Sequence, residues 1–480
     1  MNYSVMRYIL GWVLTVESLF LLISAGVGFS YGDASVTAFL ISAGLCALFG
    51  LPQVLIKPKN NIFYGKEGFC TVALSWIVLS LFGALPFVLS GEIPNYVDAL
   101  FETVSGFTTT GASVLADVEV MSHGALFWRS FTHWIGGMGV LVFLLAILPM
   151  AGGSKMQLMR AESPGPSVSK LVPKTRYTAM ILYGLYFLLS VTEIIFLCFG
   201  GLSLFSAVTL TFGTAGTGGF GILNSSAASY SPYIQWVLAV FMMLFGVNFN
   251  VYFLLIIRKW KQGLKNEELR TYLGIIAAAT ALVTLNIQER GLPLGDTIRT
   301  AFFQVSSIIT TTGFSTCDFD AWPTFSKVIL VCLMFIGASA GSTGGGIKIS
   351  RVLILFKRAK EEIQHFINPR TVTRIRLDGK TVDREVIHST SAFLITYIFI
   401  FAASVLLIAL EGHDTSTCFT AVAATINNIG PGLSMVGPAQ NFAFFTPFSK
   451  IVLIFNMLVG RLELFPLLLL FSRKVWKSGR

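Results

Sequence analysis

The sequence predicts an all-α polytopic membrane protein with about ten transmembrane helices. The first observation is its composition: 54% of the 480 residues are hydrophobic and only 12% are charged, whereas about 25% is typical of soluble domains. The mean hydropathy of +0.73 agrees with this. The second observation is a series of long apolar runs, and the third is an internal repeat of Thr- and Gly-rich turns. An ordinary soluble protein, a disordered chain and a disulfide scaffold are therefore excluded.

Ten apolar runs are long enough to cross a bilayer. They cover residues 8–29, 36–56, 70–90, 126–150, 178–200, 233–257, 271–287, 325–357, 390–410 and 447–472. The first run follows Arg7, as the apolar part of a signal peptide would. Because this run is long, contains Glu17 and lacks an Ala-x-Ala cleavage site, we expect it to be a transmembrane helix. Ten spans place both termini on the same side of the membrane.

The formal charge of +10 is distributed unevenly along the chain. Most Lys and Arg residues lie in loops on the side of the N-terminus, ten of them between residues 348 and 384. By the positive-inside rule this side, with both termini, is cytoplasmic. The other face carries twelve acidic residues, which either concentrate cations at a pore mouth or are ordinary solvated loop carboxylates. This placement of positive charge favours a lipid surface and excludes nucleic acid as the partner.

The cysteines and histidines indicate neither a disulfide scaffold nor a metal site. No C-x-x-C pair occurs among the six cysteines, so we interpret them as small hydrophobic residues. A Cys317–Cys418 pair remains an open alternative, because both residues lie in linking segments. The five histidines have no carboxylate at metal-ligand spacing, so no zinc site is predicted.

Four short semi-polar segments interrupt the spans at nearly regular intervals. Each reads as a helix of about a dozen residues that stops at a glycine turn, in residues 98–111, 205–219, 300–313 and 417–430. The unit is a spanning helix, a half-helix, a turn and a second spanning helix. The predicted divisions are two N-terminal helices in residues 1–66 and repeats in residues 67–176, 177–268, 269–386 and 387–480.

The turn glycines, Gly111, Gly219, Gly313 and Gly430, follow one another at 108, 94 and 117 residues. An irregular backbone at membrane depth must be surrounded by protein or water, so the four turns are expected to converge on one axis. Glycine permits positive φ, which lets successive carbonyls point inward, where they can replace the water shell of a cation. A single glycine would more simply indicate close helix packing. Four equivalent turns favour a cation pore, pseudo-fourfold because Asn428 departs from the pattern.

Two further features lie at membrane depth. Residues 337–346 contain five glycines, and such a segment cannot form a stable helix interior. It contains no phosphate-loop motif. The remaining alternatives are a mobile loop in the pore and a kinked, tightly packed helix. Arg461 lies near mid-membrane in the last run, where a charge usually faces a pore or a partner. Its alternatives are pairing with Glu463 and snorkelling to the cytoplasm. Arg129, His133 and Trp134 are interpreted as interface anchors.

These motifs carry a resemblance to a known family. The stretches 127–139, 310–315, 339–346 and 460–465, together with the four repeats, are similar to the TrkH/TrkG branch of the Trk/Ktr/HKT superfamily of bacterial potassium uptake proteins. The resemblance covers essentially the whole chain, including the two additional N-terminal helices. It implies four M1–P–M2 potassium-channel-like repeats around a pseudo-fourfold pore, with potassium as substrate and no cofactor in this chain.

The resemblance also assigns residues and partners. It implies a potassium filter formed by Thr109, Thr110, Gly111, Thr217, Gly218, Gly219, Thr311, Thr312, Gly313, Asn428, Ile429 and Gly430. It implies a gate formed by Gly337, Gly341, Gly344, Gly345, Gly346, Lys348 and Arg461. Glycine in all four turns goes with potassium preference, and the extra Gly218 is expected to loosen the second wall. The implied partners are a second copy, giving a homodimer, and a cytoplasmic ring of nucleotide-binding, TrkA-like RCK regulatory subunits.

Two other functions remain open on the residues. A potassium symporter would couple uptake to protons or sodium through the intramembrane carboxylates Glu17 and Glu193. A potassium-binding subunit of an ATP-driven pump would use the same pore with an ATPase partner. We expect uptake across the cell membrane without enzyme activity.

Overall fold

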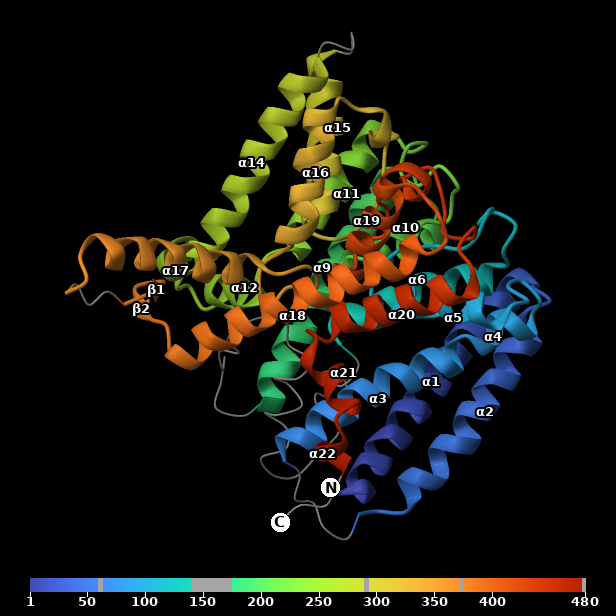
Figure 1. Cartoon of the computed structure of the whole chain (residues 1–480). Helices are drawn as coiled ribbons and strands as arrows, with labels where there is room; N and C mark the ends of the chain where they lie inside the picture. Colours follow the sequence, from blue (N-terminus) through green and yellow to red (C-terminus); the bar gives the residue numbers. More distant parts are fainter. Residues whose placement is uncertain (59–63, 140–174, 289–292, 371–373, 477–480) are drawn as a thin grey trace.

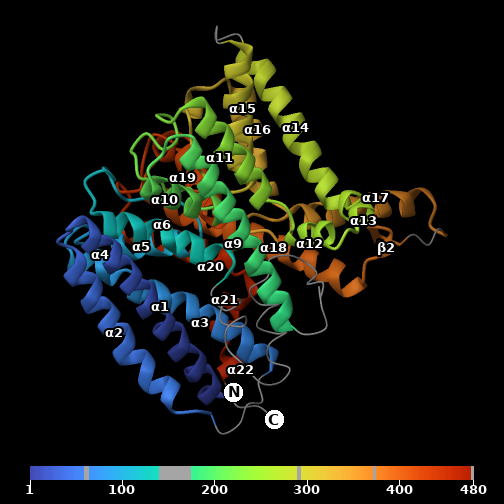
Figure 2. The same cartoon turned by 180° about the vertical axis from the view of Figure 1, so that it is seen from behind.

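The computed structural model describes residues 1–58, 64–139, 175–288, 293–370 and 374–476. These residues form helices, joined by turns, and one short β-hairpin (Figures 1 and 2). The two N-terminal helices, α1 (Tyr3–Tyr31) and α2 (Val36–Leu55), pack along each other and against the first repeat. Tyr3 donates a hydrogen bond to the Trp476 carbonyl at 3.2 Å, so the two ends of the described chain meet.

The remaining elements follow the order of the predicted repeats. The first repeat has α3 (Gly65–Gly83), α4 (Leu85–Leu89), α5 (Tyr96–Phe107) and α6 (His123–Gly137). The second has α9 (Thr175–Phe199), α10 (Leu204–Ala215), α11 (Pro232–Phe245), α12 (Phe249–Ile256) and α13 (Trp260–Leu264). The third has α14 (Glu267–Ile287), α15 (Leu294–Ile309), η2 (Phe319–Ala321), α16 (Thr324–Ile336), α17 (Ile349–Ile367), β1 (Arg376–Leu377) and β2 (Lys380–Thr381). The fourth has α18 (Arg384–Ala409), α19 (Thr415–Ile426), η3 (Ser434–Val436), α20 (Pro447–Arg461), α21 (Phe465–Leu470) and α22 (Arg473–Trp476).

Several helices have the length and apolarity of membrane spans. Within the described ranges these number six, namely α1, α2, α3 with α4, α9, α14 and α18, and the bent pair α11 and α12 makes up to seven. The predicted run 126–150 is helical as α6, and its residues 140–150 lie outside the described residues. The fold is thus the predicted all-α membrane protein, although several spans are interrupted.

Three of the predicted runs are broken, and for 233–257 and 447–472 this corrects the expectation of a continuous helix. The run 233–257 bends by 89° between α11 and α12, because the side chain of Asn248 accepts a hydrogen bond from the Asn250 N–H and starts a new helix. The run 325–357 is interrupted by residues 337–348, as its five glycines predicted. The run 447–472 stops after Arg461, where Glu463 and Leu464 adopt positive φ. Hydropathy alone does not detect these breaks, because apolar residues flank each of them.

The four half-helices are α5, α10, α15 and α19, and they are 12, 12, 16 and 12 residues long. At about 1.5 Å per residue none of them spans a hydrocarbon core of about 30 Å. Polar caps begin three of them: Asn95, Ser203 and Asp414 each accept a hydrogen bond from a backbone N–H in the first turn. Each half-helix ends directly before one of the glycine turns, as predicted.

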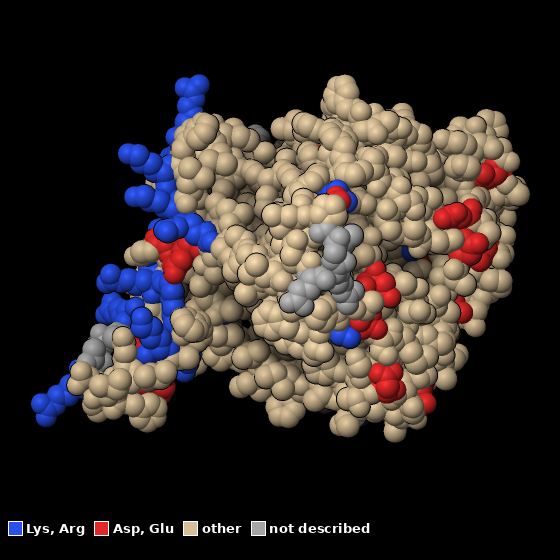
Figure 3. Space-filling model, turned by 90° about the horizontal axis from the view of Figure 1, so that it is seen from above, with Lys and Arg blue, Asp and Glu red and all other residues tan. Residues whose placement is uncertain are grey.

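Charge is segregated along the molecule. In Figure 3 most Lys and Arg side chains gather at one end and most Asp and Glu side chains at the other. The basic end contains the α12–α14 connection, α17 and the hairpin, in which Arg376 pairs with Thr381. All six cysteines are free, which excludes the Cys317–Cys418 pair.

Candidate ion pore

The four glycine turns share one unusual backbone conformation. In each turn a Thr or Asn with positive φ is followed two residues later by a glycine with positive φ. The φ values are 55° and 79° for Thr109 and Gly111, 55° and 77° for Thr217 and Gly219, 60° and 89° for Thr311 and Gly313, and 55° and 100° for Asn428 and Gly430. Positive φ is uncommon for threonine, so its repetition at three equivalent threonines marks a built feature of the fold.

One hydrogen bond repeats in all four turns as well. The residue between the two positive-φ positions donates its backbone N–H to the carbonyl five residues earlier in the half-helix. These bonds are Thr110 to Ser105, Gly218 to Gly213, Thr312 to Ser307 and Ile429 to Ala424, each 2.8 Å long. The fourth turn therefore has the same shape as the others, although its sequence is Asn-Ile-Gly.

The four turns close into a ring in chain order. A Cβ added to any of the four glycines would meet a carbonyl oxygen of the next turn. It would lie 1.9 Å from the Gly218 oxygen for Gly111, 2.1 Å from the Thr312 oxygen for Gly219, 2.1 Å from the Ile429 oxygen for Gly313, and 2.8 Å from the Thr110 oxygen for Gly430. We call residues 109–111, 217–219, 311–313 and 428–430 the glycine ring. Only glycine lets these backbones approach so closely.

The glycine ring opens into a shared cavity. This cavity has a volume of about 230 Å³ and is lined by Gly111, Gly219, Gly313 and Gly430 together with the segments that follow them. The half-helices end at the ring, so the partly negative ends of their dipoles point toward it. A ring of backbone carbonyls beneath an open vestibule is an arrangement that can bind a dehydrated cation.

A buried ion pair supports the first turn from behind. Arg129 Nε donates to Glu102 Oε1 at 2.5 Å, and the two side chains are 4% and 0% exposed. Arg129 also donates to the Gly221 carbonyl at 3.0 Å and lies 3.5 Å from the centre of the Phe220 ring. Glu102 accepts in addition from Ser113 and from the Val114 N–H, both at 3.0 Å. The interface-anchor interpretation of Arg129 is therefore wrong, because this side chain joins the first two repeats beside the ring.

His133 is also buried rather than placed at the membrane surface. Its Nδ1 donates to the Gly106 carbonyl at 2.8 Å, and a Cβ added to Gly218 would lie 2.3 Å from the same Nδ1. Position 218 therefore has no room for a Cβ, because the imidazole packs directly against the second turn. This packing contradicts the expectation that the extra glycine loosens that wall. Trp134 donates to Ser190 at 3.2 Å, a contact with α9.

The segment 337–348, which we call the glycine loop, lies against the glycine ring. The Gly345 N–H donates to Thr311 Oγ1 at 2.6 Å. A Cβ on Gly344 would lie 2.8 Å from the Thr310 carbonyl oxygen, and one on Gly345 would lie 2.4 Å from the Asn427 oxygen. The loop is non-helical, and Gly337, Gly341, Gly346 and Lys348 have positive φ. Of the two sequence alternatives, a kinked helix is excluded by this conformation.

Two charged side chains hold the glycine loop, one from α20 and one from the loop itself. Arg461, the last residue of α20, donates to the Thr343 carbonyl at 2.9 Å and to the Gly136 and Gly137 carbonyls at 2.5 and 2.7 Å. Lys348 Nζ donates to the Gly344 carbonyl within the loop. Arg461 therefore connects the loop to the end of α6.

Glu268, at the start of α14, fastens both ends of the loop. Its Oε1 accepts from the Ala340 N–H at 2.7 Å and from the Ser350 N–H at 3.2 Å, and the residue is 5% exposed. The sequence analysis missed Glu268; its only signal is a carboxylate at the start of an apolar run, beside the basic loop 258–265. Glu463 forms an ion pair with Arg351 of α17 at 2.6 Å.

Four half-helices, a closed carbonyl ring and an open vestibule together define an ion-transport protein of the membrane rather than an enzyme. The comparisons with known proteins agree. The family model TrkH, a cation transport protein, matches residues 35–478. The chain belongs to this family, and the predicted family membership is confirmed.

Individual relatives match over the whole length. The Trk system potassium uptake protein TrkH of Salmonella typhimurium is 37% identical over 492 residues, which cover 100% of both chains. The Trk system potassium uptake protein TrkG of Escherichia coli K12 is 33% identical over 480 residues, 99% of each chain. The crystal structure of the potassium transporter TrkH from Vibrio parahaemolyticus matches with a TM-score of 0.88 at 31% identity, covering 99% of this chain and 100% of that chain. This likeness confirms the fold class.

Proposed function

We propose that the chain is the pore-forming membrane subunit of a potassium uptake system and that the glycine ring is its selectivity filter. The observation that carries this proposal is the closure of four equivalent turns into one ring of backbone carbonyls. The relatives that share the whole length are named as potassium uptake proteins, which supports potassium as the cation.

The filter residues are assigned from the positive φ at the first and third position of each turn. Residues of the ring, from Thr109 to Gly111 and at the equivalent positions of the other turns, direct successive carbonyls toward the axis. Carbonyl oxygens there replace the water that a potassium ion loses on entry. The side-chain amide of Asn428 donates to Thr110 Oγ1 at 2.9 Å, which ties the atypical fourth turn to the first. Glycine at all four turn positions supports preference for potassium over sodium.

The glycine loop is the gate in this proposal. It contacts two of the four turns through Gly344 and Gly345, and a segment so close beneath the filter obstructs the path of an ion. Opening requires the loop to leave Thr311 and to break the hydrogen bonds from Arg461 and to Glu268. Lys348, inside the loop, moves with it.

The topology and partners are also proposals. The basic end of the molecule faces the cytoplasm together with both termini, and the acidic end faces outward. The four repeats take the predicted boundaries at residues 67, 177, 269 and 387. We expect a homodimer in the cell membrane that is controlled by a TrkA-like, nucleotide-binding RCK ring. Such a ring would act on the exposed basic surface of α17 and the hairpin, which connect directly to the gate.

The proposal is tested by ion flux into liposomes that contain the purified chain, with opposed potassium and proton gradients. For a gated channel, potassium moves down its own gradient, responds to voltage and ignores the proton gradient. The Arg461→Ala variant is measured in parallel, so that a closed gate is not mistaken for an inactive filter. Absence of potassium-selective flux in both proteins would contradict the proposal.

A coupled symporter is the second candidate, and buried carboxylates favour it. Glu17 of α1 and Glu193 of α9 are both 0% exposed. Neither oxygen of Glu17 has a hydrogen-bond partner within the described residues, and Glu193 lies beside Thr214 of the second half-helix. Uphill potassium uptake driven by the proton gradient alone, lost in Glu17→Gln or Glu193→Gln, would establish this alternative.

A further inference from the structure

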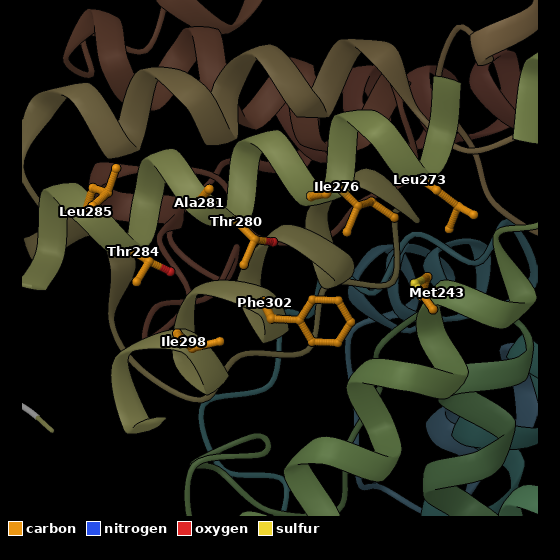
Figure 4. A pocket seen from close by; sticks show the side chains of 10 residues that line it. Met243, Leu273, Ile276, Thr280, Ala281, Thr284, Leu285, Ile298 and Phe302 are labelled. Atoms are coloured by element: carbon orange, nitrogen blue, oxygen red, sulfur yellow. The ribbon is translucent and has the colours of Figure 1, made fainter. Parts of the chain in front are cut away.

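An apolar groove lies on the side of the bundle, away from the pore. It has a volume of about 610 Å³ and runs between α11 and α14 over the half-helix α15 (Figure 4). Met243 of α11, Ile276 of α14, and Ile298 and Phe302 of α15 contribute apolar walls. Leu285, at the edge of the groove, is 73% exposed, so the groove is open to the surroundings of α14. Because α14 is a membrane span, those surroundings are the lipid bilayer.

Two hydroxyl groups interrupt the apolar lining. Thr280 and Thr284 lie one turn apart on α14, and Figure 4 shows both side chains directed toward Ile298 and Phe302. Within the described part of the chain, neither the Thr280 Oγ1 nor the Thr284 Oγ1 has a hydrogen-bond partner, and both atoms are buried. The Thr284 residue as a whole is 7% exposed. Thr271 on the same helix satisfies its hydroxyl in the usual way, by donating to the Glu267 carbonyl at 2.9 Å. Unpaired buried hydroxyls are costly, so this pair points to a ligand with a polar group.

The depth of these hydroxyls identifies the ligand class. Helix α14 begins at Glu267, at the basic end of the molecule. At about 1.5 Å per residue Thr280 lies about 20 Å and Thr284 about 26 Å along the helix axis. With the basic end facing the cytoplasm, as proposed above, Thr284 reaches the level of the ester groups of the outer leaflet in a hydrocarbon core of about 30 Å, and the apolar walls extend from there toward the bilayer centre. A long alkyl chain with a carbonyl at its outer end fits this pattern.

We propose that the groove binds one acyl chain of an outer-leaflet glycerophospholipid. The ester carbonyl accepts a hydrogen bond from Thr284, Thr280 lies one turn deeper beside the start of the chain, and the alkyl tail packs along Ile276 and Met243. The bound chain also covers Ile298 and Phe302 of α15, the half-helix that carries the third turn of the glycine ring. The lipid thereby supports the pore from outside without entering it.

The test measures phospholipid bound to the purified, detergent-solubilised protein by native mass spectrometry, with phosphatidylethanolamine as the added probe. Ala277 lines the groove and its neighbour Ala278 does not, so Ala277→Phe fills the groove and Ala278→Phe is the matched control. We expect one phospholipid to be retained by the wild-type chain and by Ala278→Phe and to be lost from Ala277→Phe. Thr284→Val, which keeps the shape, should bind about fivefold more weakly, as expected for one lost hydrogen bond.

Each other outcome overturns the proposal. Equal retention by Ala277→Phe and Ala278→Phe would place the lipid elsewhere. Conversion of dimers to monomers by Ala277→Phe alone would assign the groove to a second copy of the chain. Retention of detergent but not phospholipid would show that the groove holds an adventitious additive only. Thermal unfolding with and without added phosphatidylethanolamine checks that the variants are folded, and only the wild-type chain and Ala278→Phe should be stabilised by the lipid.

Discussion

The glycine ring and the glycine loop are neighbours with opposite construction. Each turn of the ring is closed by its own half-helix through the same 2.8 Å backbone hydrogen bond. The loop has backbone hydrogen bonds as well, such as those from Ile347 to Phe335 and from Lys348 to Ile336, but it is also held by side chains from distant helices, chiefly Glu268 and Arg461. Glycine is needed in both for the same two reasons, because each contains glycines with positive φ and glycines whose Cβ would meet a neighbouring backbone. Within the described residues, these charged side-chain contacts are therefore the part of the loop's support that the ring lacks, and they are the contacts that a substitution can remove without changing the backbone.

Breaking the ring should have the largest effect. Gly111→Ser places a Cβ where only 1.9 Å separates it from the Gly218 oxygen, so the first turn must move and its carbonyls lose their positions. We expect the preference for potassium over sodium to fall at least about tenfold, since a change of about 1.4 kcal/mol in relative binding suffices. The measurement is the flux of each ion into liposomes. Gly91→Ser is the control, because Gly91 also has positive φ but open space around it.

Releasing the loop through Arg461 should have the next largest effect. Arg461→Ala removes charge-assisted hydrogen bonds to Thr343, Gly136 and Gly137. Such bonds contribute about 1.5–3 kcal/mol each, so basal potassium flux should rise at least about tenfold while selectivity is retained. Arg473→Ala, which removes an exposed side chain of α22, should leave flux unchanged. A correctly folded Arg461→Ala protein with wild-type flux would rule out its gating role.

Weakening Glu268 should loosen the loop more gently. Glu268→Gln retains one acceptor oxygen but loses the charge that strengthens the bonds from Ala340 and Ser350. We expect basal flux to rise about fivefold, corresponding to about 1 kcal/mol. Glu267→Gln is the matched control, since its side chain pairs with Lys357 at 2.5 Å and does not contact the loop. Equal flux in the two variants would show that Glu268 does not fasten the gate.

The smallest expected effect is on the stability of the half-helix α19, and it comes from removing its cap, Asp414. The Thr417 hydroxyl and N–H donate to Asp414, the cap of α19, and hold the pKa of its carboxyl below the usual value. A lowered pKa stabilises the fold above about pH 4, and this contribution is lost as pH falls through the folded-state pKa. Asp414→Ala should cost about 1 kcal/mol at pH 7, measured by thermal unfolding. The difference from wild type should shrink as the pH falls below the ordinary pKa of an aspartate and through the lowered folded-state pKa; a pH-independent difference would contradict it.

The sequence was informative where structure is local. The four glycine turns were predictable because each is encoded within about fourteen residues and occurs four times. The breaks at Asn248 and Glu463 were not, because a single capping or positive-φ residue hardly changes hydropathy. The roles of Arg129 and His133 were also missed, since they depend on Glu102 and Gly218, partners brought together only by the packing of helices.

The closure of the ring has a consequence for how the protein is made. The fourth turn meets the first through Asn428 and Thr110, which are 318 residues apart, and Lys450 pairs with Asp98 at 2.6 Å across 352 residues. Contacts of such high sequence separation form late, after the local helices. During synthesis the ring therefore cannot close until the last repeat has been inserted, and until then the first and third turns each lack a neighbour on one side. Under the proposed function, ion selectivity is therefore a property that no shorter nascent chain possesses, and insertion of the final repeat is the step that completes the pore.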